Sequence, residues 1–213
     1  MPSFSAELRA AADGLWRAQL DHPFVRGIGD GTLDPERFRR YVRQDYVFLV
    51  DYGRALALAC ARAAGLDASR RFAALAHETL GGEMELHRSY AAEWGISATE
   101  LETEPPAPAT RAYTDFLLRT AALGDFGELA AALLPCMWGY SELGRALPRP
   151  EHELYARWVD AYASDEFAGL AAWCRGLVDE VAEGAGDAAR DRMRAAFLES
   201  SRHELAFWDA AWR

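Results

Sequence analysis

Residues 129–147 read LAAALLPCMWGYSELGRAL, and they show most clearly the pattern that recurs along the chain. Large apolar side chains return there every three or four residues, which is the spacing of one face of an α-helix. The members of this stripe are Leu129, Leu133, Cys136, Tyr140, Leu143 and Leu147. The stretch therefore predicts a long helix with the thiol of Cys136 on its inward face.

Pro135 lies directly before that thiol, inside the predicted helix. A proline in a helix removes one backbone hydrogen bond and clashes with the preceding turn, at a cost of about 3 kcal/mol. A cysteine on an apolar stripe is by itself usually a core residue. The neighbouring proline indicates a local geometric requirement and favours a functional site around Cys136.

The three-and-four spacing covers almost the whole chain, and alternating runs rich in Val, Ile and Thr are nearly absent. This pattern predicts an all-α fold. A proline at 23, an Asp34-Pro35 start signal, and further proline and glycine clusters divide the chain into helices. We expect them at about residues 5–20, 34–64, 68–94, 110–123, 125–147, 151–161, 165–182 and 187–212, with a turn at 27–33 and an extended connection at 96–110.

Length and charge limit the class of protein. With 213 residues, 51% of them apolar, the chain is long enough for a substantial core, and we expect one domain spanning residues 1–213. A net charge of −10 without a basic patch argues against nucleic acid as a partner. Charged residues interrupt the first 20 positions, so we expect neither a signal peptide nor a membrane span, and a cytoplasmic location.

The three cysteines, Cys60, Cys136 and Cys174, are widely spaced and odd in number. This spacing suits neither a disulfide framework nor a CxxC metal site. We expect thiols without disulfides.

Two carboxylates occupy positions where helical spacing predicts core residues. Asp45 shares a face with Phe38, Tyr41, Phe48 and Tyr52. A buried carboxylate needs a partner, so Asp45 is either a paired structural acid or a ligand-binding group.

Glu204 lies among the aromatics of the last helix, where loss of solvent should raise its proton affinity. On another helix Glu83 and His87 are i,i+4 neighbours, which favours a hydrogen bond or ion pair that orients the bundle over a catalytic role.

An inward thiol, two separated carboxylates and several tyrosines suit a flat, nitrogen-containing aromatic ligand. One carboxylate can bind an amino edge, the other can protonate a ring nitrogen, and the thiolate can add to the ring. This chemistry needs no metal or organic cofactor, and no phosphate-binding glycine loop is present. A di-iron site is less favoured, because no Glu-x-x-His motif lies on an inward face.

Several motifs resemble those of the TenA family, the thiaminase II or aminopyrimidine aminohydrolase family. They are HPFV at 22–25, GTL at 31–33, QDY at 44–46, EMELH at 83–87, LLPCMWGYSELG at 133–144, YASDEF at 162–167 and ELAFW at 204–208. The resemblance spans essentially the whole chain in order. It implies a heme-oxygenase-like helical bundle without heme, usually a homotetramer, and no cofactor.

The activity implied by the resemblance is hydrolysis of the C–N bond at the methylene substituent of a 4-amino-2-methylpyrimidine. The substrate would be aminomethyl-aminopyrimidine, or less favourably thiamin, and the product hydroxymethylpyrimidine, in thiamin salvage. By the same resemblance Cys136 is the nucleophile, Glu204 is the acid that protonates the ring nitrogen, and Asp45 binds the amino edge. The implied pocket aromatics are Phe48, Tyr113, Tyr140 and Tyr162.

Three departures from the family pattern concern substrate preference. Phe48 stands where some members have tyrosine, and Met137 and Ser141 replace residues that are often aromatic. Two alternatives stay open at this point. One is a metal-dependent oxygenase on the same scaffold, with Glu83, His87, Glu142 and Glu204 as ligands, and the other is a non-catalytic pyrimidine-binding protein.

Overall fold

A computed structural model describes residues 2–213, and within that range the regular structure is entirely helical. The described chain forms two compact units. The terminal unit consists of the residues up to Asp34 together with Gly127–Arg213, and the central unit is Pro35–Phe126. The all-α prediction is confirmed, whereas one domain for the whole chain stays a prediction.

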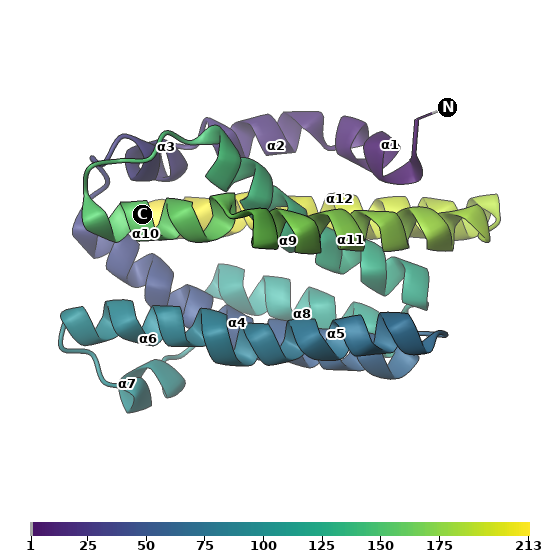
Figure 1. Ribbon diagram of the computed structural model, residues 1–213, viewed down its shortest axis with the longest axis horizontal. Helices are drawn as coiled ribbons and strands as arrows, with labels where there is room; N and C mark the ends of the chain where they lie inside the picture. The colour runs from purple at the N-terminus through teal and green to yellow at the C-terminus, as the bar shows by residue number, and fades with distance from the viewer. Residues whose placement is uncertain (1) are drawn as a thin grey trace. The chain divides into compact units, whose positions relative to one another are not determined.

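The central unit is built around α4 (Pro35–Arg62), which packs against α5 (Leu66–Glu78) and α8 (Pro108–Leu123) (Figure 1). The predicted start of α4 at Pro35 is confirmed, since the ring of a proline is already set for the first helical turn. One face of α4 is fully buried, including Tyr41, Asp45 and Tyr52, as the spacing predicts.

The predicted helix at 68–94 is interrupted. A π-helical turn, η1 (Thr79–Glu83), separates α5 from α6 (Met84–Glu93). The turn contains Gly81 and Gly82, whose lack of side chains lowers helical preference at this point. Such insertions are frequent at functional sites, and this one ends four residues before His87.

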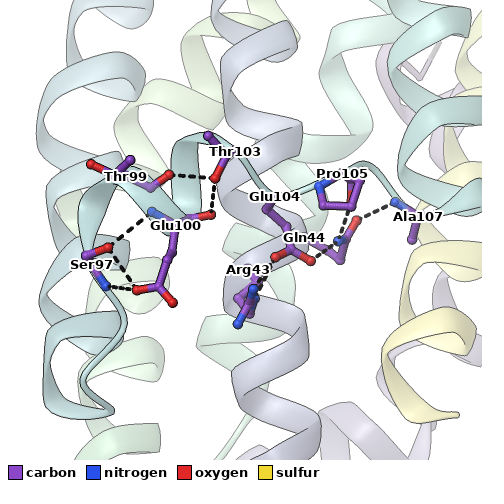
Figure 2. A network of polar contacts seen from close by, with 9 residues as sticks. All are labelled: Arg43, Gln44, Ser97, Thr99, Glu100, Thr103, Glu104, Pro105 and Ala107. Atoms are coloured by element: carbon purple, nitrogen blue, oxygen red, sulfur yellow. Dashed lines mark hydrogen bonds and ion pairs between the residues drawn. The ribbon is translucent and has the colours of Figure 1, made fainter.

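The predicted extended connection at 96–110 is wrong in part, because it contains the short helix α7 (Ala98–Glu102). Ser97 and Glu100 form a capping box, in which each side chain bonds the other's backbone N–H (Figure 2). This local motif stabilises one helical turn just before the prolines of the connection.

The terminal unit begins with α1 (Phe4–Ala11) and α2 (Asp13–Leu20), so the predicted helix at 5–20 is broken at Ala12. The predicted turn at 27–33 is also partly wrong, since α3 runs over Pro23–Gly29. His22 caps α3 by accepting a hydrogen bond from the backbone of Phe24 at 3.1 Å. Gly27 lets the chain after α3 fold back onto the helix, since a Cβ there would lie 3.1 Å from the Leu33 backbone.

Four helices complete the terminal unit. They are α9 (Phe126–Ala146), α10 (Glu153–Ala163), α11 (Asp165–Glu183) and α12 (Asp187–Trp212). The first residue of α9, Phe126, belongs to the central unit. Ser164 begins α11 by accepting a hydrogen bond from the backbone of Phe167. These helices match the predicted ones closely at both ends. Across the described residues, no helix combines the length and apolarity that a membrane crossing requires.

Candidate functional site

The predicted site residues fall into two groups, one on each unit. Cys136 and Tyr140 lie on α9, Tyr162 on α10 and Glu204 on α12, all in the terminal unit. Asp45 and Phe48 lie on α4 and Tyr113 on α8, in the central unit.

In the terminal unit, α9 and α12 run in the same direction at a constant register. The hydroxyl of Ser200 donates to the carbonyl of Ala132 at 2.7 Å, across 68 residues of sequence. Two turns later the rings of Tyr140 and Trp208, which have the same sequence separation, lie 5.4 Å apart. On each helix the two contacts are separated by about 12 Å along the axis.

Cys136 and Glu204 lie midway between those two contacts, one on each helix, with the same separation in sequence. They therefore occupy the same level of the α9–α12 pair. Each lies four residues after a member of the Ser200–Ala132 contact and four residues before a member of the Tyr140–Trp208 contact.

The exposure of Cys136 differs from that of its neighbours. From Leu129 to Ser141 every residue of α9 is buried except Cys136, which is half-buried. The apolar stripe predicts an inward side chain for Cys136, but the structure leaves this side chain partly exposed. A thiol that solvent or ligand can reach, on an otherwise buried helix, suits a nucleophile better than a core filler.

Glu204 is 2% exposed. Its helix also buries Phe197, Ser201 and Trp208, so this carboxyl group lies in the apolar surroundings that the sequence predicts.

Aromatic rings cluster around Tyr140, one helical turn beyond Cys136 on α9. The rings of Tyr140 and Tyr162 are 4.8 Å apart, and Trp158 lies 4.7 Å from Tyr162 and 5.9 Å from Tyr140. Trp158 was not predicted as a site residue. Its spacing of four from Tyr162 on α10 is the signal that could have identified it.

Gly144 explains how Tyr162 comes so close to α9. A Cβ at this position would lie 2.6 Å from the carbonyl carbon of Tyr162 and 2.7 Å from the backbone nitrogen of Ala163. Backbone atoms cannot move aside as a flexible side chain can. The glycine therefore allows the end of α10 to pack directly on α9, which fixes Tyr162 beside Tyr140.

In the central unit, Asp45 is 4% exposed and paired with His87. The Nε2 atom of His87 lies 2.8 Å from Oδ2 of Asp45, and its Nδ1 atom lies 2.9 Å from the backbone carbonyl of Glu83. The predicted need of Asp45 for a partner is confirmed. Glu83 and His87 do interact as predicted, but through the backbone of Glu83.

Burial lowers the pKa of His87, but the hydrogen bond and negative charge of Asp45, together with the charge of Glu83, outweigh it. The net result is a pKa above the ordinary value of 6.5. This direction favours the protonated imidazole, in which both ring nitrogens can donate to the two oxygens they contact.

Phe48 and Tyr113 form the aromatic part of the central group. Their ring centroids lie 4.8 Å apart, and Phe48 also stacks on Tyr52 at 5.4 Å. The phenyl ring at 48 offers no hydroxyl to a ligand, so only its apolar face can contribute to binding.

Gln44, next to Asp45 in the QDY motif, holds the start of α8. Its side-chain oxygen accepts from the backbone N–H of Ala107 at 2.7 Å (Figure 2). The same oxygen accepts from the hydroxyl of Thr110 at 2.8 Å. Its amide nitrogen donates to the carbonyl of Pro105 at 3.1 Å. These bonds tie the first turn of the helix that carries Tyr113 to α4, a role that sequence reasoning missed.

Comparison with known proteins places the chain in a family. The family model described as TENA/THI-4/PQQC matches residues 9–213. The chain belongs to the TENA/THI-4/PQQC family.

Relatives within the TENA/THI-4/PQQC family include two named Aminopyrimidine aminohydrolase. The one from Halalkalibacterium halodurans is 43% identical over 99% of this chain and 96% of its own length. The one from Bacillus subtilis is 38% identical over 99% of this chain and 90% of its own length. The predicted resemblance to this family is confirmed.

Solved structures agree on the fold. A TenA homologue from P. horikoshii OT3 is 32% identical, covers 100% of this chain and 99% of its own, and has a TM-score of 0.89. A protein from Shewanella denitrificans OS217, described as having a heme oxygenase-like fold, is 17% identical, covers 97% and 91%, and has a TM-score of 0.76. The predicted heme-oxygenase-like fold is confirmed.

The residues considered for a metal site in this TENA/THI-4/PQQC chain are engaged in other contacts. Both ring nitrogens of His87 are hydrogen-bonded, and Glu142 pairs with Arg9 at 3.2 Å. In the part of the chain that the structure describes, no three His, Cys, Asp or Glu side chains gather as metal ligands do.

Proposed function

We propose that this protein is an aminopyrimidine aminohydrolase of the thiaminase II type. Its substrate in this proposal is 4-amino-5-aminomethyl-2-methylpyrimidine, with thiamin as a possible second substrate, and its product is hydroxymethylpyrimidine for thiamin salvage. The relatives named above support the substrate class. The observation that carries the proposal is the common level of Cys136 and Glu204 on α9 and α12.

The residues have distinct roles in the proposed reaction. The thiolate of Cys136 adds to a ring carbon while Glu204 protonates a ring nitrogen, which breaks the aromaticity of the ring. The electrons of the ring then expel the protonated amine from the methylene carbon as ammonia. Water adds to that carbon with loss of a proton. Departure of the thiolate, with return of the ring-nitrogen proton to Glu204, restores the aromatic ring. Asp45 accepts a hydrogen bond from the 4-amino group.

The aromatic residues complete the proposal. Phe48, Tyr113, Tyr140 and Tyr162 bind the flat ring through their faces. No cofactor takes part. We further propose that the protein acts in the cytoplasm as a homotetramer.

Replacement of Cys136 tests the proposal. We expect Cys136→Ser to lose hydrolysis of 4-amino-5-aminomethyl-2-methylpyrimidine by about 10³-fold or more, because a serine hydroxyl is far less ionised than a thiol. Product release is followed by chromatography. Cys60→Ser is the matched control, since Cys60 is also half-buried but lies on α4, and it should retain wild-type rates. Wild-type turnover by Cys136→Ser would refute the assignment of the nucleophile.

A further inference from the structure

His87 is a buried ionisable residue that the proposed reaction does not use. It lies on α6 and is 1% exposed. Both of its ring nitrogens are held, one by Glu83 on the preceding π turn and one by Asp45 on α4. Residues of α4, η1 and α6 thus meet at one imidazole. A buried polar network in which every group is hydrogen-bonded fixes the orientation of its members.

The two hydrogen bonds determine where the protons are. A backbone carbonyl can only accept, so Nδ1 of His87 carries a proton for Glu83. The 2.8 Å contact between Nε2 and Oδ2 of Asp45 requires one more proton, on either His87 or Asp45. The negative charges of Asp45 and Glu83 beside the ring, which raise the pKa of His87, favour the imidazole as its holder.

The surrounding charges agree with this protonation state. From α4 the facing charge is Asp45, and from η1 it is Glu83. Arg88, the next residue on α6, is directed to the hydroxyl of Tyr46 at 2.8 Å and to Glu102 of α7 at 3.9 Å. The remaining α7 carboxylate, Glu100, is bound to Ser97.

We propose that His87 is a positioning residue that holds Asp45 as an ionised carboxylate, so that Asp45 only accepts hydrogen bonds and selects a 4-amino edge over a 4-oxo edge. With Oδ2 held by His87, Oδ1 accepts the proton of the ligand's amino group. A 4-oxo pyrimidine instead presents a carbonyl lone pair to that oxygen, and the two repel. The inference rests on the proposed function, in which Asp45 binds the amino edge.

This arrangement implies a pH dependence of substrate binding. As the pH rises through the raised pKa of His87, Nε2 loses its proton and turns a lone pair toward Asp45. The carboxylate then loses its orientation. KM for the amino substrate is therefore low below that pKa and rises above it.

The experiment compares wild-type protein with His87→Gln, whose amide can still donate to Asp45 but carries no charge. KM and kcat are measured for 4-amino-5-aminomethyl-2-methylpyrimidine between pH 6 and pH 9, with inhibition constants for hydroxymethylpyrimidine and its 4-oxo counterpart. We expect His87→Gln to raise KM about 10- to 100-fold with a smaller change in kcat. The preference for the amino inhibitor should fall about tenfold, and the pH dependence of KM should disappear. His77→Gln, at an exposed histidine of α5, should match wild type.

Several results overturn the inference. If KM and the preference for the amino inhibitor are unchanged in His87→Gln, His87 serves only in packing. The same conclusion follows if binding of the amino and the 4-oxo ligands weakens equally. If His87→Gln does not fold, ¹⁵N NMR of histidine-labelled wild type determines how many protons the His87 ring carries. The chain has only five histidines, so their signals can be assigned. A singly protonated His87 ring at pH 7 refutes the proposal, and a doubly protonated ring supports it. Wild type that turns over no aminopyrimidine refutes the proposed function as well, so the two failures are distinguishable.

Discussion

Cys174 and Cys136 carry the same side chain but differ in their surroundings. Cys174 is buried on α11, and burial raises the pKa of its thiol to about 12. At neutral pH it is therefore fully protonated and unreactive, whereas Cys136 is half-buried.

We expect iodoacetamide at about pH 8 to alkylate Cys136 of the native protein well before Cys174, because only a thiolate reacts. Mass spectrometry of tryptic peptides at timed intervals measures both rates. Pre-incubation with hydroxymethylpyrimidine should slow the modification of Cys136 alone. Cys174 modified first would show that its surroundings are more open than its burial indicates.

His87 also links folding to pH. Its pKa in the folded protein is raised above the ordinary 6.5, so the pair with Asp45 contributes stability that is fully present below about pH 6.5. This contribution is lost as the pH rises through the folded pKa.

The free energy of unfolding of wild type should therefore exceed that of His87→Gln by more at about pH 6 than at about pH 9. Urea unfolding followed by circular dichroism at both pH values measures the difference, with His77→Gln as the control. A gap that grows with pH would mean that His87 is neutral in the folded protein.

At the scale of elements, two glycines of α9 provide a matched pair. A Cβ at Gly144 meets the backbone of Tyr162 at 2.6 Å, whereas a Cβ at Gly139 meets nothing within 4 Å. Both residues lie in the same helix, so the helix preference gained on changing glycine to alanine is about the same.

We expect Gly144→Ala to destabilise the protein by about 1–3 kcal/mol, since α10 must shift away from α9. Gly139→Ala should stabilise it by up to about 1 kcal/mol. Denaturant midpoints give both values. Turnover by Gly144→Ala should also fall, because Tyr162 moves with α10. Equal stabilities of the two variants would contradict a close α9–α10 contact.

For the whole molecule, the central question is whether the chemistry needs a metal. The proposed reaction uses a thiol and two carboxylates, and the nitrogens of His87 are committed to Glu83 and Asp45. Prolonged dialysis against EDTA should leave the rate of aminopyrimidine hydrolysis unchanged. A loss of activity that iron or manganese restores would favour the oxygenase alternative.

Much of this protein could be predicted from local sequence. Apolar spacing identifies the helices, and it places Asp45, Cys136 and Glu204 on core-facing positions, because helical periodicity depends only on neighbouring residues. Pro35 marks the start of α4 by the same local physics. Local signals also misled, since the glycines of residues 27–33 indicate a turn where Gly27 and Gly29 are helical.

The remainder depends on residues that meet only after folding. The register between α9 and α12 comes from the Ser200–Ala132 and Tyr140–Trp208 contacts, and Cys136 and Glu204 hold matched positions in it. The partner of Asp45 is His87, 42 residues away. The π turn between α5 and α6 interrupts a stretch that the local spacing predicts as one helix. By itself the sequence determined the helices and the chemistry they could carry, because periodicity and residue type are local. Which reactive groups face one another was decided by tertiary packing, because close contact between helices depends on side chains distant in sequence.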